Sequence, residues 1–214
     1  MKFGIISDTH YHPFTAFAKQ DGLINSRLQI AMDETRKAAV HMKDAGCTAL
    51  YHCGDIFHVR GRVAPSVLNP VADLFKEIAE ELGMPIFALA GNHDLEFENS
   101  NRIGNSGTAL TGDGITVVSD EPFFQPVHNV LMIPWHAKQK DLLATIEAWL
   151  KEAPARFGVK AEEVTLMIHA PSTRSSLAYR ITVSIQTCWL ALASRTSSLV
   201  TTTTSSAFVL ACSL

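Results

Sequence analysis

The chain has 214 residues, 47% of them hydrophobic, which is enough for one domain with a buried core. No apolar stretch approaches the ~20 residues that a membrane-spanning helix needs, so we expect no membrane partner. The formal net charge of -3 indicates no basic surface for nucleic acid, although bound divalent ions would supply positive charge locally.

The first predicted strand is an apolar run at residues 2–7, and Asp8, Thr9 and His10 follow it directly. A helix is expected next, because core-type residues recur at helical spacing. These residues are Leu28, Met32, Thr35, Ala39 and Met42. His12 either faces a substrate or lies in a solvated loop, and the sequence leaves both open.

The second predicted strand, residues 49–53, leads into Gly54 and Asp55, with His58 three residues further on. Pro65 is well placed near the start of the helix that follows. The core face of that helix is predicted to be Val71, Leu74, Phe75, Ile78 and Leu82.

The third predicted strand, residues 86–90, runs into the sequence Gly-Asn-His-Asp, which contains Asn92 and His93. By itself this tetrapeptide could be only a turn, since Gly, Asn and Asp suit turns. Residues 99–114 are rich in Asn, Gly, Ser and Thr and are expected to form a loop beside the site.

Two further strands are predicted in the second half. Residues 130–134 run into Trp135 and His136, and residues 164–168 end in His169. Between them lies a third helical stripe, before Pro154, formed by Leu142, Leu143, Ile146, Trp149 and Leu150.

Alternating strands and helices predict an α/β fold. In such folds, sites form just beyond the carboxyl ends of the strands, where the polar residues of this chain follow each strand. Two carboxylates, an Asn and two or more His at that edge would form a site for two divalent metals.

The order Asp-x-His, Gly-Asp, Gly-Asn-His-Asp and then a lone His resembles the calcineurin-like metallophosphoesterase superfamily over residues 1–171. The resemblance implies an αββα sandwich of mixed sheets flanked by helices. It also implies that Asp8, His10 and Asp55 hold one metal, and that Asp55, Asn92 and His169 hold the other. Mn is the leading candidate, with Fe or Zn as alternatives, since mixed imidazole and oxygen ligands suit these ions.

By the same resemblance, His93 is the catalytic His and Asp94 orients it. The segment Gly54 to His58 resembles the Gly-Asp-hydrophobe-Phe-His signature of SbcD-type DNA repair exonucleases, in which this His is also catalytic. The implied substrate is DNA or another phosphodiester, and the implied partner is an SMC-like ATPase. The alternatives are a phosphomonoesterase, a protein or nucleotide phosphatase of the same superfamily, and a catalytically impaired fragment.

The composition changes abruptly at Ser172. Residues 172–214 contain no Gly, Pro, Asp, Glu, Lys or His, whereas 18 of these 43 residues are Ser or Thr. We therefore expect an irregular tail and a C-terminally incomplete domain. The family's Gly-His-x-His, whose two His each complete one metal site, has no counterpart after His169, so we expect the chain to be nearly inactive. Loss of the strands that would follow leaves a sheet edge and part of the core uncovered, so we also expect poor solubility.

A lost base near Pro171 would explain this tail. Every Thr codon is ACN, so residues 201–204 read one base earlier become four NAC codons, which encode only His, Tyr, Asn or Asp. Permitted codons across residues 197–204 then give Val-Phe-Ala-Gly-His-Tyr-His-His, which contains Gly-His-x-His. The alternative is a genuine Ser/Thr-rich tail.

The four Cys show no Cys-x-x-Cys pair, which favours reduced thiols and a cytoplasmic location. We also expect no signal peptide, because the first strand begins almost at Met1 and carries ligand residues directly.

Overall fold

The structure is a computed structural model that describes residues 1–97, 99, 100, 102–169 and 207–210. The chain divides into two compact units, Met1–Asp120 and Glu121–Leu214.

The first unit is built on a parallel four-stranded sheet in the order β1-β4-β5-β6. Its strands are β1 (Lys2–Ile6), β4 (Cys47–His52), β5 (Ile86–Leu89) and β6 (Ile115–Val118). The central strands are apolar on both faces, as parallel sheets usually are. Because the strands are parallel, the loops that follow β1, β4 and β5 all leave from the same edge of the sheet.

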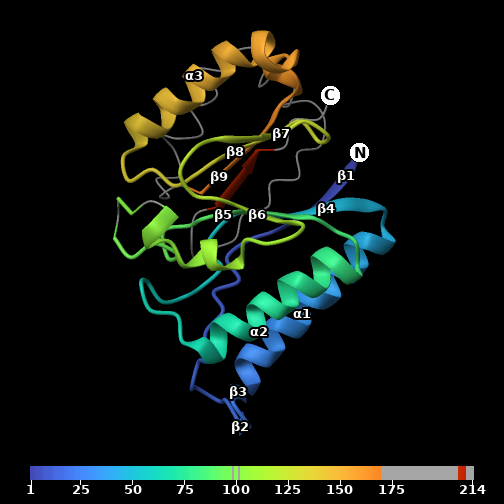
Figure 1. The fold of residues 1–214 in the computed structure, drawn as a ribbon, viewed down its shortest axis with the longest axis vertical. Helices are drawn as coiled ribbons and strands as arrows, with labels where there is room; N and C mark the ends of the chain where they lie inside the picture. The colour runs from blue at the N-terminus through green and yellow to red at the C-terminus, as the bar shows by residue number, and fades with distance from the viewer. Residues whose placement is uncertain (98, 101, 170–206, 211–214) are drawn as a thin grey trace. The chain divides into compact units, whose positions relative to one another are not determined.

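Two helices, α1 (Ser26–Asp44) and α2 (Pro65–Lys76), lie side by side and bury their apolar faces in the core of this unit (Figure 1). The helix α1 begins after Asn25, whose side chain accepts a hydrogen bond from the Leu28 N–H at 3.0 Å. The chain continues from α2 into a π-helical turn, η1 (Glu77–Glu81), which sequence periodicity did not predict.

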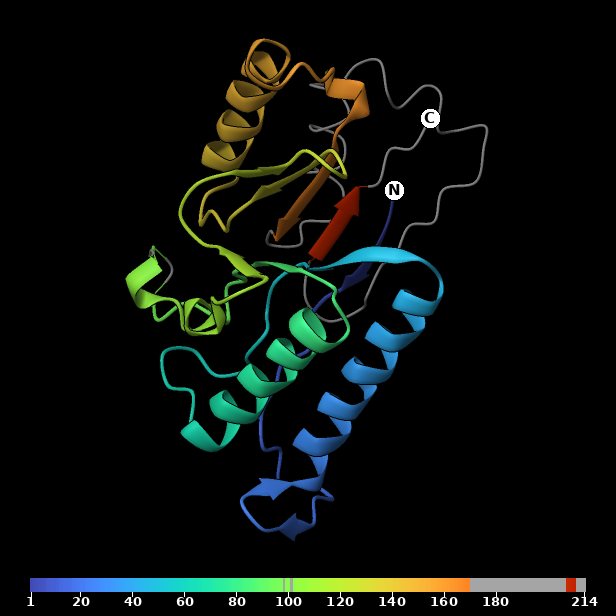
Figure 2. The same ribbon diagram turned by 45° about the vertical axis from the view of Figure 1, so that its right-hand side comes forward.

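Shorter elements complete the first unit. The strands β2 (Gln20–Asp21) and β3 (Ile24–Asn25) form a hairpin directly before α1 (Figure 2). The region expected to be a loop at residues 99–114 contains two 3₁₀ turns, η2 (Arg102–Gly104) and η3 (Ser106–Leu110). Asn105 caps η3 by accepting a hydrogen bond from the Gly107 N–H.

The second unit contains a mixed sheet in the order β10-β9-β8-β7. Its strands are β7 (Phe123–Gln125), β8 (Val130–Ile133), β9 (Thr165–His169) and β10 (Ala207–Leu210). Only β8 and β9 are parallel among these neighbours. One face packs against α3 (Gln139–Phe157), which is followed by the short turn η4 (Ala161–Glu163). The helix continues past Pro154 and ends at Gly158, which has a φ of 68°.

The predicted α/β class is confirmed, with a sheet and packed helices in each unit. Within the tail that the sequence predicts to be irregular, the described residues Ala207–Leu210 pair antiparallel with β9. The physical reason is local, since the sequence Ala-Phe-Val-Leu is apolar and suited to a strand. The rest of the tail lies outside the described residues. Within the described residues, no helix is both long and apolar enough to span a bilayer.

Candidate metal centre

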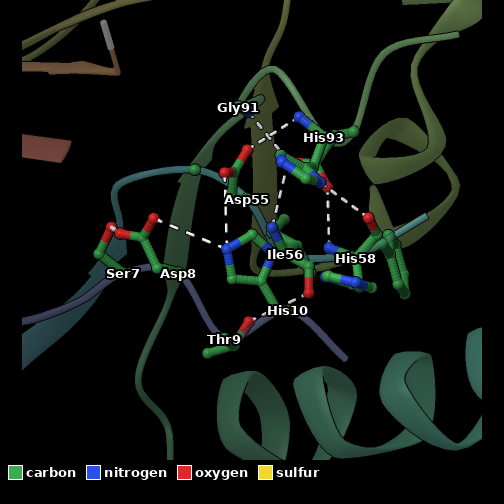
Figure 3. A network of polar contacts seen from close by, with 12 residues as sticks. Ser7, Asp8, Thr9, His10, Asp55, Ile56, His58, Gly91 and His93 are labelled. Carbon is green, nitrogen blue, oxygen red and sulfur yellow. Dashed lines mark hydrogen bonds and ion pairs between the residues drawn. The ribbon is translucent and has the colours of Figure 1, made fainter. Parts of the chain in front are cut away.

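Three loops of the first unit meet at the carboxyl edge of the parallel sheet. Three main-chain hydrogen bonds connect the loop after β1 to the loop after β4. The N–H groups donate to carbonyl oxygens, from Asp8 to Gly54 at 3.0 Å, from His10 to Asp55 at 3.1 Å and from Tyr11 to Ile56 at 2.8 Å. The loop after β5 joins them, because the His93 N–H donates to Asp55 Oδ1 at 2.9 Å. Hydrogen bonds of the backbone therefore hold Asp8, His10, Asp55 and His93 near one another. Figure 3 shows these four residues from close by.

Asp8, His10 and Asp55 form a compact group of possible metal donors. The Nε2 atom of His10 lies 3.9 Å from Asp8 Oδ1 and 3.7 Å from Asp55 Oδ2. Both distances are too long for a hydrogen bond. They are close to the separation of ligand atoms that share one ion at ~2.0–2.2 Å. Two carboxylates and an imidazole therefore fit a divalent transition metal.

The backbone at these donors is unusual. Asp8, His10 and Asp55 have φ angles of 54°, 44° and 55°, in the left-handed region that residues other than glycine seldom adopt. Each such residue costs on the order of 1–3 kcal/mol and persists only where the surroundings impose it. The surroundings here are the hydrogen bonds between the two loops, and this placement of strain is typical of functional sites.

Gly91 allows the third loop to approach Asp55. A Cβ atom at position 91 would collide with the backbone nitrogen and the Oδ1 atom of Asp55, and it would lie 2.9 Å from Cγ. Asn92 follows, and its chain neighbours Gly91 and His93 both contact Asp55. Its proposed role as a ligand stays a prediction.

A second group of possible donors, His10, His58 and His93, adjoins the first. The ring of His10 lies 5.4 Å from that of His58 and 4.9 Å from that of His93. Burial is the main cause that lowers the pKa of His58, and the nearby His10 and His93 lower it further. The lowered pKa favours an uncharged His58 imidazole, which can act as a ligand or accept a proton.

The tautomer of His93 follows from its partner. Its Nδ1 atom lies 2.8 Å from the main-chain oxygen of His58. A carbonyl oxygen only accepts, so Nδ1 carries a proton and donates it. In a neutral ring, the Nε2 atom of His93 therefore carries no proton.

The expectation that Asp94 orients His93 is wrong. The Asp94 carboxylate is fully buried and accepts hydrogen bonds from the backbone N–H groups of Ile56, Phe57 and Gly91, at 3.2, 2.9 and 2.9 Å. Burial raises the pKa of Asp94 to about 6, although these three donors oppose the rise. Asp94 thus joins the loop after β4 to the loop after β5, a role that its place in the sequence did not indicate.

His169 belongs to the second unit. It ends β9, is 1% exposed, and lies with its ring 5.8 Å from that of Trp135. Alternation along the strand places it on the side opposite Ile168, which packs against α3. Its ligation of a metal together with Asp55 and Asn92 stays a prediction.

The sequence is compatible with His12 either facing a substrate or lying in a solvated loop. Its ring lies 4.8 Å from that of Phe14 and 5.1 Å from that of His58. Phe14 is also 4.8 Å from His58. These rings extend the His cluster along the loop after β1. Phe14 gave no signal in the sequence, because a lone aromatic residue in a loop has no periodicity to interpret.

The sequence matches the Calcineurin-like phosphoesterase (Metallophos) family over residues 1–180. The chain therefore belongs to this family of metal-dependent phosphoesterases, which are hydrolases. A solved structure with some similarity is the crystal structure of Pseudomonas putida nuclease MPE, which is 20% identical with a TM-score of 0.36. The match covers 60% of this chain and 51% of the nuclease, so the chain spans about half the length of that protein. No curated protein matches the chain.

Proposed function

We propose that this chain is a two-metal phosphodiesterase of the nuclease type, with DNA as its substrate and Mn as its leading metal, Fe and Zn being the alternatives. The observation that carries the proposal is the shared position of His10, which borders both the Asp8–Asp55 carboxylates and the His58–His93 pair. The proposed metal donors and the proposed catalytic imidazoles thus lie at one edge of a sheet, which supports metal-assisted phosphoryl transfer.

Each metal position has its own proposed donors. Asp8, His10 and Asp55 would hold the first ion, while Asp55, Asn92 and His169 would hold the second. Two such ions supply a nucleophilic hydroxide at neutral pH and neutralise charge on the phosphate. Asp55 suits a shared position, because its side chain is fully buried and its Oδ1 atom is already fixed by the His93 N–H.

The proposed catalytic residues are His93 and His58. With its Nδ1 proton donated to the His58 carbonyl, His93 keeps Nε2 for the substrate. There it would stabilise developing charge or, in the imidazolium form in which Nε2 also carries a proton, pass that proton to the leaving oxygen. His58 therefore contributes twice, through its carbonyl, which orients His93, and through its ring, which lies 5.7 Å from the His93 ring.

A diester substrate is favoured over a monoester by the His58 signature alone. The segment Gly54 to His58 resembles the nuclease subgroup, and the ring of His58 does lie in the cluster with His10 and His93. An SMC-like ATPase partner and a cytoplasmic location belong to the same proposal. The alternatives are a phosphomonoesterase and, because no His follows His169, a catalytically impaired fragment.

The test uses the full chain with Mn and four substrates: single-stranded DNA, double-stranded DNA ends, bis-p-nitrophenyl phosphate and p-nitrophenyl phosphate. We expect weak hydrolysis of the diesters that needs added metal and is lost in Asp55→Asn. Faster hydrolysis of the monoester would favour the phosphatase alternative. Metal binding without any hydrolysis would favour the impaired fragment.

A further inference from the structure

His52 is a polar residue at the buried end of β4. It is the last residue of β4, its side chain is 0% exposed, and it pairs with Ile6 in β1 and Ala88 in β5. It therefore lies at the root of all three loops of the candidate metal centre. Burial of a polar side chain is costly unless its hydrogen bonds are satisfied, so its partners are informative.

Two hydrogen bonds fix the tautomer of His52. The Gly54 N–H donates to its Nδ1 at 3.2 Å, so that nitrogen carries no proton. In a neutral imidazole the proton is then on Nε2, which lies 2.9 Å from Thr9 Oγ1 and donates to it. The Thr9 hydroxyl in turn donates to the Ile56 carbonyl at 3.2 Å.

The result is a directed series of hydrogen bonds from Gly54 through His52 and Thr9 to Ile56. Its two ends are the chain neighbours of Asp55. Thr9, the third of its four residues, lies between Asp8 and His10 in the sequence. The series therefore connects the residues that flank every donor of the first metal group.

We propose that His52 is a positioning residue, which acts through Thr9 to hold the Asp8–His10 loop and the Asp55 loop at the separation that metal binding requires. This inference rests on the metal site of the proposed function. Groups hydrogen-bonded directly to metal ligands typically change metal affinity 10–100-fold when they are removed. For a series that acts through the backbone beside the ligands, we expect the lower end of this range.

The test is Mn affinity of the full chain by titration calorimetry, with two variants at Thr9. Thr9→Val removes the hydroxyl and keeps the branched shape, so we expect about tenfold weaker binding. Thr9→Ser keeps the hydroxyl and should bind within about twofold of the wild type. His52→Phe should lose at least as much as Thr9→Val. The double variant, with both His52→Phe and Thr9→Val, should lose no more Mn affinity than the single variant that binds Mn more weakly. The reason is that both changes interrupt the same series of hydrogen bonds.

The outcome that overturns the proposal is wild-type Mn affinity in Thr9→Val, since His52 would then only fill space. If His52→Phe does not fold, the Mn affinities of the two Thr9 variants still test the proposal. A second measurement, the ¹⁵N spectrum of the imidazole in the metal-free protein, should show the proton on Nε2. A proton on Nδ1 would also overturn the proposal.

Failure of the proposed function is distinguishable from failure of this inference. If the wild type binds no Mn, the proposed function fails. In that case the backbone amide resonances of Asp8, His10 and Asp55 in the metal-free protein decide the inference. These amide resonances should shift in Thr9→Val and keep their positions in Thr9→Ser. If they keep their positions in both variants, the inference about His52 is overturned.

Discussion

At the residue scale, Asp55 has the most constrained side chain of the first metal group. It is fully buried, its Oδ1 atom accepts the His93 N–H, and its Oδ2 atom faces His10 Nε2 at 3.7 Å. A carboxylate held in this way cannot rotate to relieve the loss of one partner. A change in the charge of Asp55 would therefore alter its contacts with both His93 and His10.

The first prediction follows from this position. Asp55→Asn should weaken Mn binding more than His10→Ala, because in the proposed site the Asp55 carboxylate would serve both ions whereas His10 would serve one. Calorimetric titration of the two variants with Mn measures the difference. Equal losses in the two variants would argue against a bridge at Asp55.

The second prediction concerns Gly91. Gly91→Ala should lower the free energy of unfolding by about 1–3 kcal/mol, because the new methyl group would collide with the backbone and carboxylate of Asp55. Urea unfolding monitored by circular dichroism measures it. Gly112→Ala is the matched control, since a Cβ atom there meets nothing within 4 Å. Equal stability of the two variants would contradict the crowding at Asp55.

The sequence predicts the residues of the site better than their contacts. Asp8, His10, Asp55 and His93 could be anticipated because each follows a buried strand, and parallel strands end at one edge. The hydrogen bonds of Asp94 with Ile56 and Phe57 could not be anticipated, because the donors are backbone N–H groups on a loop about forty residues away in the sequence. Neither the residue types nor their spacing in the sequence can predict such contacts.

At the scale of elements, α1 and η1 are joined by an ion pair. The Nε and Nη2 atoms of Arg36 donate to the two carboxylate oxygens of Glu77, both at 2.7 Å. This two-pronged geometry is the strongest form of a side-chain ion pair. The hydrogen bond from Arg36 holds the pKa of Glu77 below its ordinary value.

The third prediction is a pH dependence of stability. Glu77→Gln should cost roughly 0.5–1 kcal/mol at pH 7, because the pair is partly exposed. A lowered folded-state pKa means that the stabilisation is complete above the unfolded pKa of about 4.3. It is lost as the pH falls through the folded pKa, where Glu77 takes up a proton. Urea unfolding of both proteins from pH 7 to pH 3 should therefore converge at the acid end.

The control for this prediction is Glu34→Gln. Glu34 also pairs with a cation, Lys37, but both side chains are mostly exposed. Its removal should leave the pH profile of unfolding close to that of the wild type. A constant difference between the wild type and Glu77→Gln at every pH would contradict the ionic origin of the effect.

Elements were predictable where hydrophobic periodicity determines them. The stripes of α1 and α3 and the apolar runs of β1, β4, β5, β8 and β9 all mark observed elements. The π-helical turn η1 was not predictable, because Ile78 and Leu82 keep helical spacing across it. Two-residue strands such as β2 and β3 are too short to show any period.

At the scale of the whole molecule, the change of composition at Ser172 is the feature that bears most on activity. The family match ends at residue 180, and no His follows His169. A four-residue strand, Ala207–Leu210, nevertheless covers the edge of β9. A covered edge limits pairing with other chains, but it supplies no metal ligand.

The last prediction tests the hypothesis that a base was lost near Pro171. Inserting one nucleotide after codon 171 should restore Gly-His-x-His and with it one further ligand for each metal. We expect a more soluble protein with tighter Mn binding and hydrolysis of bis-p-nitrophenyl phosphate at ordinary enzyme rates, ~1–10³ per second. The control carries the same insertion with both restored His replaced by Ala, which should recover solubility without activity. The hypothesis fails if the unaltered chain already hydrolyses diesters at such rates, or if the insertion changes neither solubility nor Mn affinity.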